Sequence, residues 1–276
     1  MSLSAVLFLF LAHLAIGIAF TLLLIPREAG VKFFRFNSGL ATILLAVSLA
    51  FRPAGIIQSA PTSTSTASLV ALTVAQGAIL LYWGTVGRVR IPLRRWLVSL
   101  AVLAGSVAMT MQALTIAADR AAAMKVLTVA SFLSSAAFLG GACTAMILGH
   151  WYLVIPSMQV TYLQSMVKFH IGSMIVRVVV VAAAVLLAIG MPTGHPWHSP
   201  QGFDFRHYIF SVAGIFFWQR VLFGLAGPAV LSYLTWETAK IRSTQSATGI
   251  LYVDFFTVVV GEVLAKYLLL ATRVPV

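Results

Sequence analysis

The stretch ILYVDFFTVVVGEVLAKYLLLAT, residues 250–272, decides the fold class of this chain. It is mostly apolar and long enough to cross a hydrocarbon core as a helix, since a crossing takes about 20 such residues. Three ionisable side chains nevertheless interrupt it, Asp254, Glu262 and Lys266. Positions 254, 258, 262 and 266 follow one another at four-residue steps and therefore share one helix face. Because a charge at the bilayer centre costs at least ~2.5 kcal/mol, we expect this face to meet other helices or a hydrated cavity.

The composition of the whole chain indicates a membrane protein. Its 276 residues are 61% hydrophobic and only 9% charged, whereas a soluble domain is about one quarter charged. The net charge of +12 does not indicate nucleic-acid binding, because Lys and Arg gather in short loops, where they set membrane orientation. The single cysteine, Cys143, excludes an internal disulfide, c-type haem and an iron–sulfur cluster held by four Cys of this chain.

Eight apolar segments predict an all-α, polytopic membrane protein with eight transmembrane helices in a bundle. They cover residues 5–25, 38–57, 68–86, 96–118, 126–154, 167–191, 207–236 and 250–272. No connecting segment is long enough to hold a soluble domain. Residues 1–276 are therefore expected to form a single transmembrane domain, and any large catalytic machinery belongs to another chain.

The basic residues between the apolar segments predict the orientation. The second loop carries no Lys or Arg, whereas the first and third loops carry Arg27, Lys32, Arg35, Arg88, Arg90, Arg94 and Arg95. By the positive-inside rule the odd-numbered loops face the cytoplasm. Both termini are therefore expected outside, with the chain in the inner (cytoplasmic) membrane of the cell.

Five polar side chains are predicted to lie in the outer half of the membrane when each residue advances a helix by ~1.5 Å, with Arg52 and Lys266 closer to the outside than the others. They are His13, Arg52, Gln76, Glu262 and Lys266. His13 lies in the middle of LFLFLAHLAIGIAF (residues 7–20), without a polar neighbour in its own turn. A quinone site needs an apolar slot, a hydrogen-bonding group such as His, and a carboxylate or hydroxyl that exchanges the proton. We therefore predict that His13, Glu262, Gln76 and Arg52 bind quinone.

Further ionisable residues lie near the middle of the predicted membrane. Arg177 and Arg220 have Glu262 as the acid closest in depth, and Lys266 follows Glu262 by one helical turn. Asp254, Arg220, Arg177 and Lys266 are therefore expected to act as a proton relay or as interhelical ion pairs.

A second polar group lies near the predicted inner surface. Asp254 and His170 have nearly the same predicted depth, which predicts a hydrogen-bonded pair. His150, in the segment GHWYLVIP, lies at the same side of the membrane. Two histidines on neighbouring helices are the usual ligands of a low-spin b-type haem, so His150 and His170 are candidate haem ligands.

Three segments resemble those of a known family. VVVGEVLAKYLLLA (258–271), with Gly261 before Glu262, is similar to a closing helix. SFLSSAAFLGGACTAMILG (131–149) is similar to a glycine-rich helix, and FFWQRVLFGLAG (216–227) to a Trp-x-Arg-Val-Leu segment. The family is that of the eight-helix membrane anchors of molybdopterin oxidoreductases, of the dimethyl-sulfoxide-reductase and polysulfide-reductase (NrfD-like) type.

This resemblance implies a haem-free subunit that exchanges electrons between quinone and partner redox proteins in a respiratory complex. The partners implied are an iron–sulfur or cytochrome subunit and a catalytic subunit, and the quinone is menaquinone or ubiquinone. His13 would be a quinone ligand, and Glu262, Lys266 and Arg220 would be equivalents of family residues. His150 and His170 have no place in the family pattern.

Three other functions stay open. The chain would be a b-type cytochrome if His150 and His170 held haem b. It would be a proton-coupled transporter if its buried charges formed a relay, although no internal repeat supports this. It would be a structural anchor if the charges only joined helices. Each alternative requires contact with membrane lipid, none involves nucleic acid, and the sequence predicts no metal site.

Overall fold

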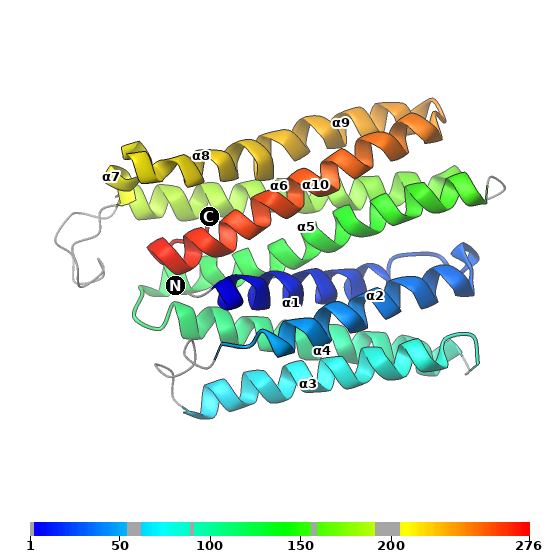
Figure 1. Cartoon of the computed structure of the whole chain (residues 1–276), viewed down its shortest axis with the longest axis horizontal. Coiled ribbons are helices and arrows are strands. Elements are labelled where there is room, and N and C mark those ends of the chain that lie inside the picture. Colours follow the sequence, from blue (N-terminus) through cyan, green and yellow to red (C-terminus); the bar gives the residue numbers. More distant parts are fainter. Residues whose placement is uncertain (1–2, 54–61, 89–90, 156–158, 191–204) are drawn as a thin grey trace.

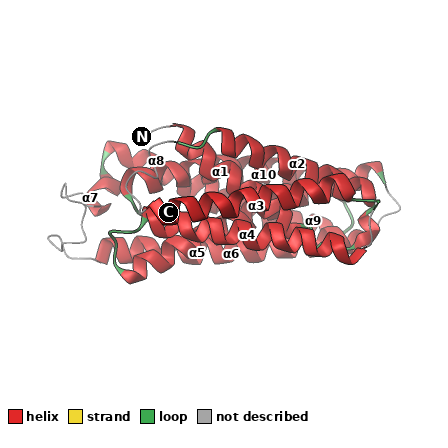
Figure 2. Cartoon of the chain, turned by 90° about the horizontal axis from the view of Figure 1, so that it is seen from below, coloured by secondary structure: helices red, strands yellow, loops and turns green. Residues whose placement is uncertain are grey.

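The computed structural model describes residues 3–53, 62–88, 91–155, 159–190 and 205–276, and every regular element within these ranges is a helix (Figures 1 and 2). Eight helical spans among them are long and apolar enough to cross a membrane. The predicted all-α class is confirmed, and so is the prediction of eight helices with the length and composition of membrane spans.

Six uninterrupted helices form the first part of the chain. They are α1 (Leu3–Thr21), α2 (Val31–Ala50), α3 (Thr62–Thr85), α4 (Ile91–Ile116), α5 (Ala122–Val154) and α6 (Val160–Gly190). The short helix η1 (Arg27–Ala29) connects α1 to α2. The eighth span is α10 (Thr244–Thr272), which contains the whole stretch 250–272.

Most helices begin earlier than the apolar segments predict, and the difference is largest for the second and the sixth. The second was expected over 38–57, but α2 begins at Val31, directly after Gly30, whose φ of 87° gives the chain a sharp turn. Lys32 and Arg35 therefore lie in the first turns of α2 and not in a loop. Their long side chains can still reach the membrane interface, because Lys and Arg can extend from a helix end. The sixth helix begins at Val160 rather than at 167. The predicted residues 54–57 lie outside the described ranges.

The seventh span is interrupted, unlike the single helix predicted over 207–236. It consists of α7 (Phe205–Phe210), η2 (Val212–Gly214), α8 (Ile215–Val221), the π-helical turn η3 (Leu222–Ala226) and α9 (Gly227–Lys240). Such π-helical turns add a residue to the helix and recur at functional sites. Here the turn begins two residues after Arg220, a residue of the buried site described below.

Helices α1, α5 and α10 form the centre of the bundle (Figure 1). Helix α5 packs against α1, α4, α6 and α10, and most side chains of α1 and α5 are buried. A Cβ atom built on Gly17 or on Gly140 would overlap the backbone of the other helix, so α1 and α5 cross in backbone contact. Both ends of the chain lie toward the same end of the bundle, opposite the connections α1–α2 and α3–α4.

Candidate functional site

Glu262 of α10 lies in the centre of the bundle and contacts three basic side chains. Its carboxylate lies 2.9 Å from Arg177 Nε, 2.8 Å from Arg220 Nη2 and 3.3 Å from Lys266 Nζ. Each of these side chains is at most 2% exposed. Removing charges from water is costly unless they are paired and hydrogen-bonded, so this cluster places a strong constraint on how α6, α8 and α10 pack.

Arg177 makes the most complete set of contacts in this cluster. Its Nε and Nη2 donate to the two oxygens of Glu262, which is the bidentate geometry that strengthens an arginine–carboxylate pair. Its Nη1 donates to Ser131 Oγ at 2.6 Å and to the Ser131 carbonyl oxygen at 3.2 Å. Nη2 also donates to the carbonyl oxygen of Val276. Arg177 thereby joins α6 to α5 and α10.

Arg220 reaches Glu262 from α8 through a gap that glycines leave. A Cβ on Gly224 would overlap Arg220 Nη1, and a Cβ on Gly261 would overlap the Gly224 backbone. Arg220 is fully buried, and its Nε and Nη1 have no hydrogen-bond partner among the described residues. Gly224 therefore leaves the space for the guanidinium, and Gly261, which precedes Glu262, lets the Gly224 backbone approach α10.

Ser135 of α5 connects the cluster to His13 of α1. Ser135 Oγ donates to Glu262 Oε2 at 2.5 Å, and Lys266 Nζ donates to the same hydroxyl at 2.6 Å. His13 Nδ1 lies 3.2 Å from this hydroxyl, and its ring contacts Phe132 edge-on. The predicted proximity of His13 to Glu262 is confirmed, although a serine joins them.

The contacts of Ser135 assign the tautomer of His13. A serine hydroxyl has one proton and two lone pairs, and this proton is directed at Glu262. The hydroxyl must therefore accept from both Lys266 Nζ and His13 Nδ1–H. In a neutral His13 ring, Nε2 is then left with a lone pair. This atom is buried and has no partner among the described residues.

A second buried pair lies further along α10. His170 Nε2 of α6 and Asp254 Oδ2 are 2.8 Å apart, with side chains at most 1% exposed. The His170 ring stacks on Phe138 with centroids 5.2 Å apart. The atoms lie at ion-pair distance without the alignment of a hydrogen bond. The predicted pairing of Asp254 with His170 is confirmed as a contact.

The two buried clusters are separate. Asp254 precedes Glu262 by eight residues on α10, or ~12 Å of helix. The hydroxyls of Ser173 and Thr257 lie between them but donate to carbonyl oxygens of their own helices. Of the residues proposed for a proton relay or ion pairs, Arg177, Arg220 and Lys266 thus surround Glu262, whereas Asp254 belongs to the other cluster.

The two histidines considered as haem ligands, His150 of α5 and His170 of α6, lie at different heights along the axis of α5. A Cβ built on Gly141 would be 3.4 Å from His170 Nδ1, so His170 is level with Gly141. His150 is nine residues further along the same helix, which is ~14 Å. It is exposed and contacts the Tyr252 hydroxyl. This separation does not support one haem held by both, and haem binding stays a prediction.

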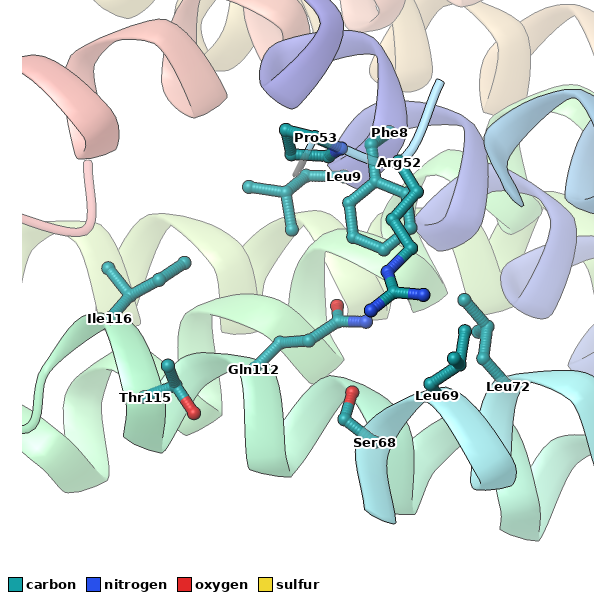
Figure 3. A pocket seen from close by; sticks show the side chains of 10 residues that line it. All are labelled: Phe8, Leu9, Arg52, Pro53, Ser68, Leu69, Leu72, Gln112, Thr115 and Ile116. Atoms are coloured by element: carbon teal, nitrogen blue, oxygen red, sulfur yellow. The ribbon is translucent and has the colours of Figure 1, made fainter. Parts of the chain in front are cut away.

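Arg52 and Gln76 lie apart from the charged cluster. Gln76 Nε2 donates to the Thr42 carbonyl oxygen, which joins α3 to α2. Arg52 lines a pocket at the end of the bundle, where its guanidinium points toward Gln112 (Figure 3). The apolar walls of this pocket include Leu9 and Leu72. Among the described residues, no hydrogen bond or ion pair joins Arg52 or Gln76 to Glu262, so their role in quinone binding remains a prediction.

The pocket nevertheless adjoins the predicted residues. Leu9 precedes His13 by one turn of α1, and Leu72 precedes Gln76 by one turn of α3. Leu9, Leu72 and Phe132 belong to the same buried apolar cluster, and Phe132 contacts the His13 ring. About 30 Å³ of the pocket is unfilled in this side-chain arrangement.

The two serines of α5 are the site residues that the sequence analysis missed. Ser131 and Ser135 are four residues apart and face Arg177 and Glu262 respectively. The segment SFLSSAAFLGG was noted only for its glycines, although polar residues at a four-residue spacing on an apolar helix indicate a buried face. Serine hydroxyls can also bond to their own helix, which is why the spacing alone gives no strong signal.

No protein-family model matches the chain, and no curated protein matches it. The resemblance to the NrfD-like anchors therefore stays a prediction.

Proposed function

We propose that this chain is a quinone-reactive integral membrane subunit of a respiratory oxidoreductase complex. It lies in the inner membrane, with both termini outside, and exchanges electrons between the quinone pool and partner redox subunits. The sequence resemblance and the polar residues buried in an apolar bundle support this proposal. The observation that carries it is the connected set His13–Ser135–Glu262, in which His13 Nε2 has no partner within the described part of the chain.

The residues present suit a quinone head group at His13. Bound quinone supplies two-electron, two-proton redox chemistry. The lone pair on His13 Nε2 is placed to accept a proton from a hydroxyl group, which favours the oxidation of quinol over the reduction of quinone. The positive charge then lies on the imidazole ring, whose Nδ1–H donates to Ser135, and the Ser135 hydroxyl donates to Glu262. The Glu262 carboxylate favours a positive charge on His13 through one intervening hydroxyl group, whereas burial and the nearby Lys266 and Arg177 cations oppose it.

Access would come from the pocket at Arg52 (Figure 3). Its walls are mainly apolar, and it lies one helical turn of α1 from His13. The free space corresponds to about two water molecules at most, so ring entry requires wall side chains such as Phe8 to rotate. Arg52 and Gln112 would then provide polar contacts near the entrance.

The proposal is tested by the affinity of the purified full-length chain for a short-chain naphthoquinol, measured by calorimetry in lipid nanodiscs. His13→Phe keeps a ring at this position and removes both nitrogens. We expect the dissociation constant to rise at least ~10-fold, equivalent to ~1.4 kcal/mol. Arg52→Gln should weaken binding by a smaller factor, because Arg52 lies at the entrance and not at the reacting atoms.

His207→Phe is the matched control, because His207 is an exposed histidine of α7. Its dissociation constant should equal that of the unaltered chain. Absence of saturable binding by the unaltered chain would overturn the proposal. Equal affinities of His13→Phe and the unaltered chain, both folded, would leave the charged cluster with a structural role only.

A further inference from the structure

A second cavity lies at the opposite end of the bundle from the chain termini. It has a volume of about 230 Å³ and opens between the α1–α2 connection, the end of α3 and the start of α4. This is many times the ~10–15 Å³ that holds one water molecule on the same measure. No residue of the proposed quinone site lines it.

Three arginines line this cavity, and its described lining contains no carboxylate. Arg27 comes from η1, whereas Arg94 and Arg95 come from the start of α4. Cations near a helix N-terminus are disfavoured by the helix dipole, and an anion placed there is stabilised by both the arginines and the dipole. The cavity is therefore electrostatically complementary to an anion.

The remaining walls are apolar and continue to the outer surface of the bundle. Leu22, Val86 and Val98 are buried in the cavity floor, and Tyr82 contributes its ring. Leu23 and Val31 also line the cavity but are 37% and 49% exposed. A free inorganic ion would gain nothing from these walls, whereas a lipid brings an acyl chain that buries against them.

Aromatic side chains place this end of the bundle near a membrane interface. Trp96 of α4 is 74% exposed, and Trp83 of α3 is 37% exposed. Exposed tryptophans gather at the level of lipid headgroups, and basic pockets between spanning helices at the cytoplasmic side bind anionic headgroups. The cavity thus lies where phospholipid phosphates are found.

We propose that this cavity is a binding site for the phosphate headgroup of an anionic phospholipid, held by Arg27, Arg94 and Arg95. The acyl chains lie against the exposed apolar side chains Leu23 and Val31. The site is independent of the proposed redox function, because it lies at the other end of the bundle and shares no residue with the His13–Ser135–Glu262 set.

The test is native mass spectrometry of the full-length chain with phosphatidylglycerol and phosphatidylcholine of identical acyl chains. The unaltered chain should bind its first phosphatidylglycerol at least ten-fold more tightly than phosphatidylcholine. The triple variant Arg27→Gln, Arg94→Gln, Arg95→Gln should bind the two lipids equally. Addition of 10 mM inorganic phosphate should leave phosphatidylglycerol bound, and its displacement would identify free phosphate as the ligand and overturn the proposal.

A control with the same charge change separates a site from general attraction to basic residues. Lys32, Arg35 and Arg88 are exposed residues at the same end of the bundle and do not line the cavity. The triple variant with Gln at these three positions should keep the preference for phosphatidylglycerol. Equal losses in the two triple variants would show diffuse electrostatics and overturn the site.

A further variant keeps the test decisive if the triple variant does not fold. Leu23→Cys places a thiol at the exposed edge of the cavity, and the native Cys143 is buried. Nanodiscs with phosphatidylglycerol should slow maleimide labelling of this thiol at least five-fold relative to nanodiscs with phosphatidylcholine. Equal labelling rates would contradict occupation of the cavity by the anionic lipid.

Discussion

Gly261 of α10 and Gly224 of η3 lie in backbone contact, because a Cβ atom on Gly261 would overlap the Gly224 Cα. This crossing brings Arg220 to Glu262, the residue that follows Gly261. Small residues at helix crossings let backbones approach within membranes, where packing drives helix association. The position of the charged cluster therefore depends on two residues without side chains.

Gly261→Ala should destabilise the chain by about 1–3 kcal/mol, the usual cost of overpacking, because the added methyl group separates α10 from η3. Unfolding followed by circular dichroism in mixed micelles measures this. Gly249→Ala is the control on the same helix, since a Cβ there meets no atom within 4 Å. It should be neutral or stabilising, as Ala is the better helix former by up to ~1 kcal/mol. Equal effects of both substitutions would contradict the backbone contact.

Glu262→Gln should be among the most destabilising single changes. It leaves Arg177, Arg220 and Lys266 buried without a counter-charge, and breaking a buried pair in this way costs about 3–5 kcal/mol. The same unfolding measurement applies. Glu237→Gln removes a carboxylate that is 44% exposed and paired with Lys240, and should cost less than ~1 kcal/mol.

Removal of a cation should partly rescue Glu262→Gln. In the double variant Glu262→Gln, Arg220→Gln, one unpaired buried charge is removed, so the total loss should be smaller than the sum of the single losses. We expect a coupling energy of at least ~1 kcal/mol, within the range of residues in contact. Strict additivity would contradict a direct interaction between the two side chains.

Ser135→Ala should separate the role of the buried network in stability from its proposed role in quinone binding. It removes the hydroxyl that joins His13 to Glu262 and that accepts from Lys266, whereas the direct contacts of Arg177, Arg220 and Lys266 with Glu262 remain. A loss of about 1–3 kcal/mol is expected from polar groups left unpaired. Naphthoquinol affinity should also fall, because Nδ1 of His13 loses its acceptor. Ser134→Ala, whose hydroxyl bonds within α5, is the control. A change in stability without a change in affinity would argue against the proposed role of His13.

Asp254 and His170 should be coupled in a double-mutant cycle. Asp254→Asn and His170→Gln each break the contact between α10 and α6, and their combined cost should differ from the sum by at least ~1 kcal/mol. His150→Gln, at an exposed contact with Tyr252, should change stability by less than ~0.5 kcal/mol. A cycle without coupling energy would contradict the ion-pair distance between Asp254 and His170.

The predicted orientation is tested with a membrane-impermeant thiol reagent on intact cells. Glu28 lies between α1 and α2, and Asp119 lies between α4 and α5, and both are exposed. Because the basic first loop is expected inside, Asp119→Cys should react in intact cells and Glu28→Cys only after permeabilisation. The buried Cys143 should stay unreactive. The opposite pattern would invert the topology.

The sequence by itself determined the helical class, the eight apolar spans and the depths of the ionisable residues. Helix length and rise follow from local apolar composition, so His13 could be matched to Glu262, and Asp254 to His170, along the bundle axis. The interruption of the seventh span was not predicted, although Pro228, which lacks the N–H of a regular helical turn, lies two residues after the π-helical turn.

Only the tertiary structure decided which helices are neighbours and how each is rotated. Depth supplies one coordinate, whereas contact needs the crossing points set by Gly17 with Gly140 and by Gly224 with Gly261. For this reason Arg52 and Gln76, predicted in the same half of the membrane as His13, make no hydrogen bond or ion pair with its cluster among the described residues. For the same reason Ser135, unremarkable in an apolar helix, joins three ionisable residues. Packing of small residues, which periodicity does not reveal, assembled the site.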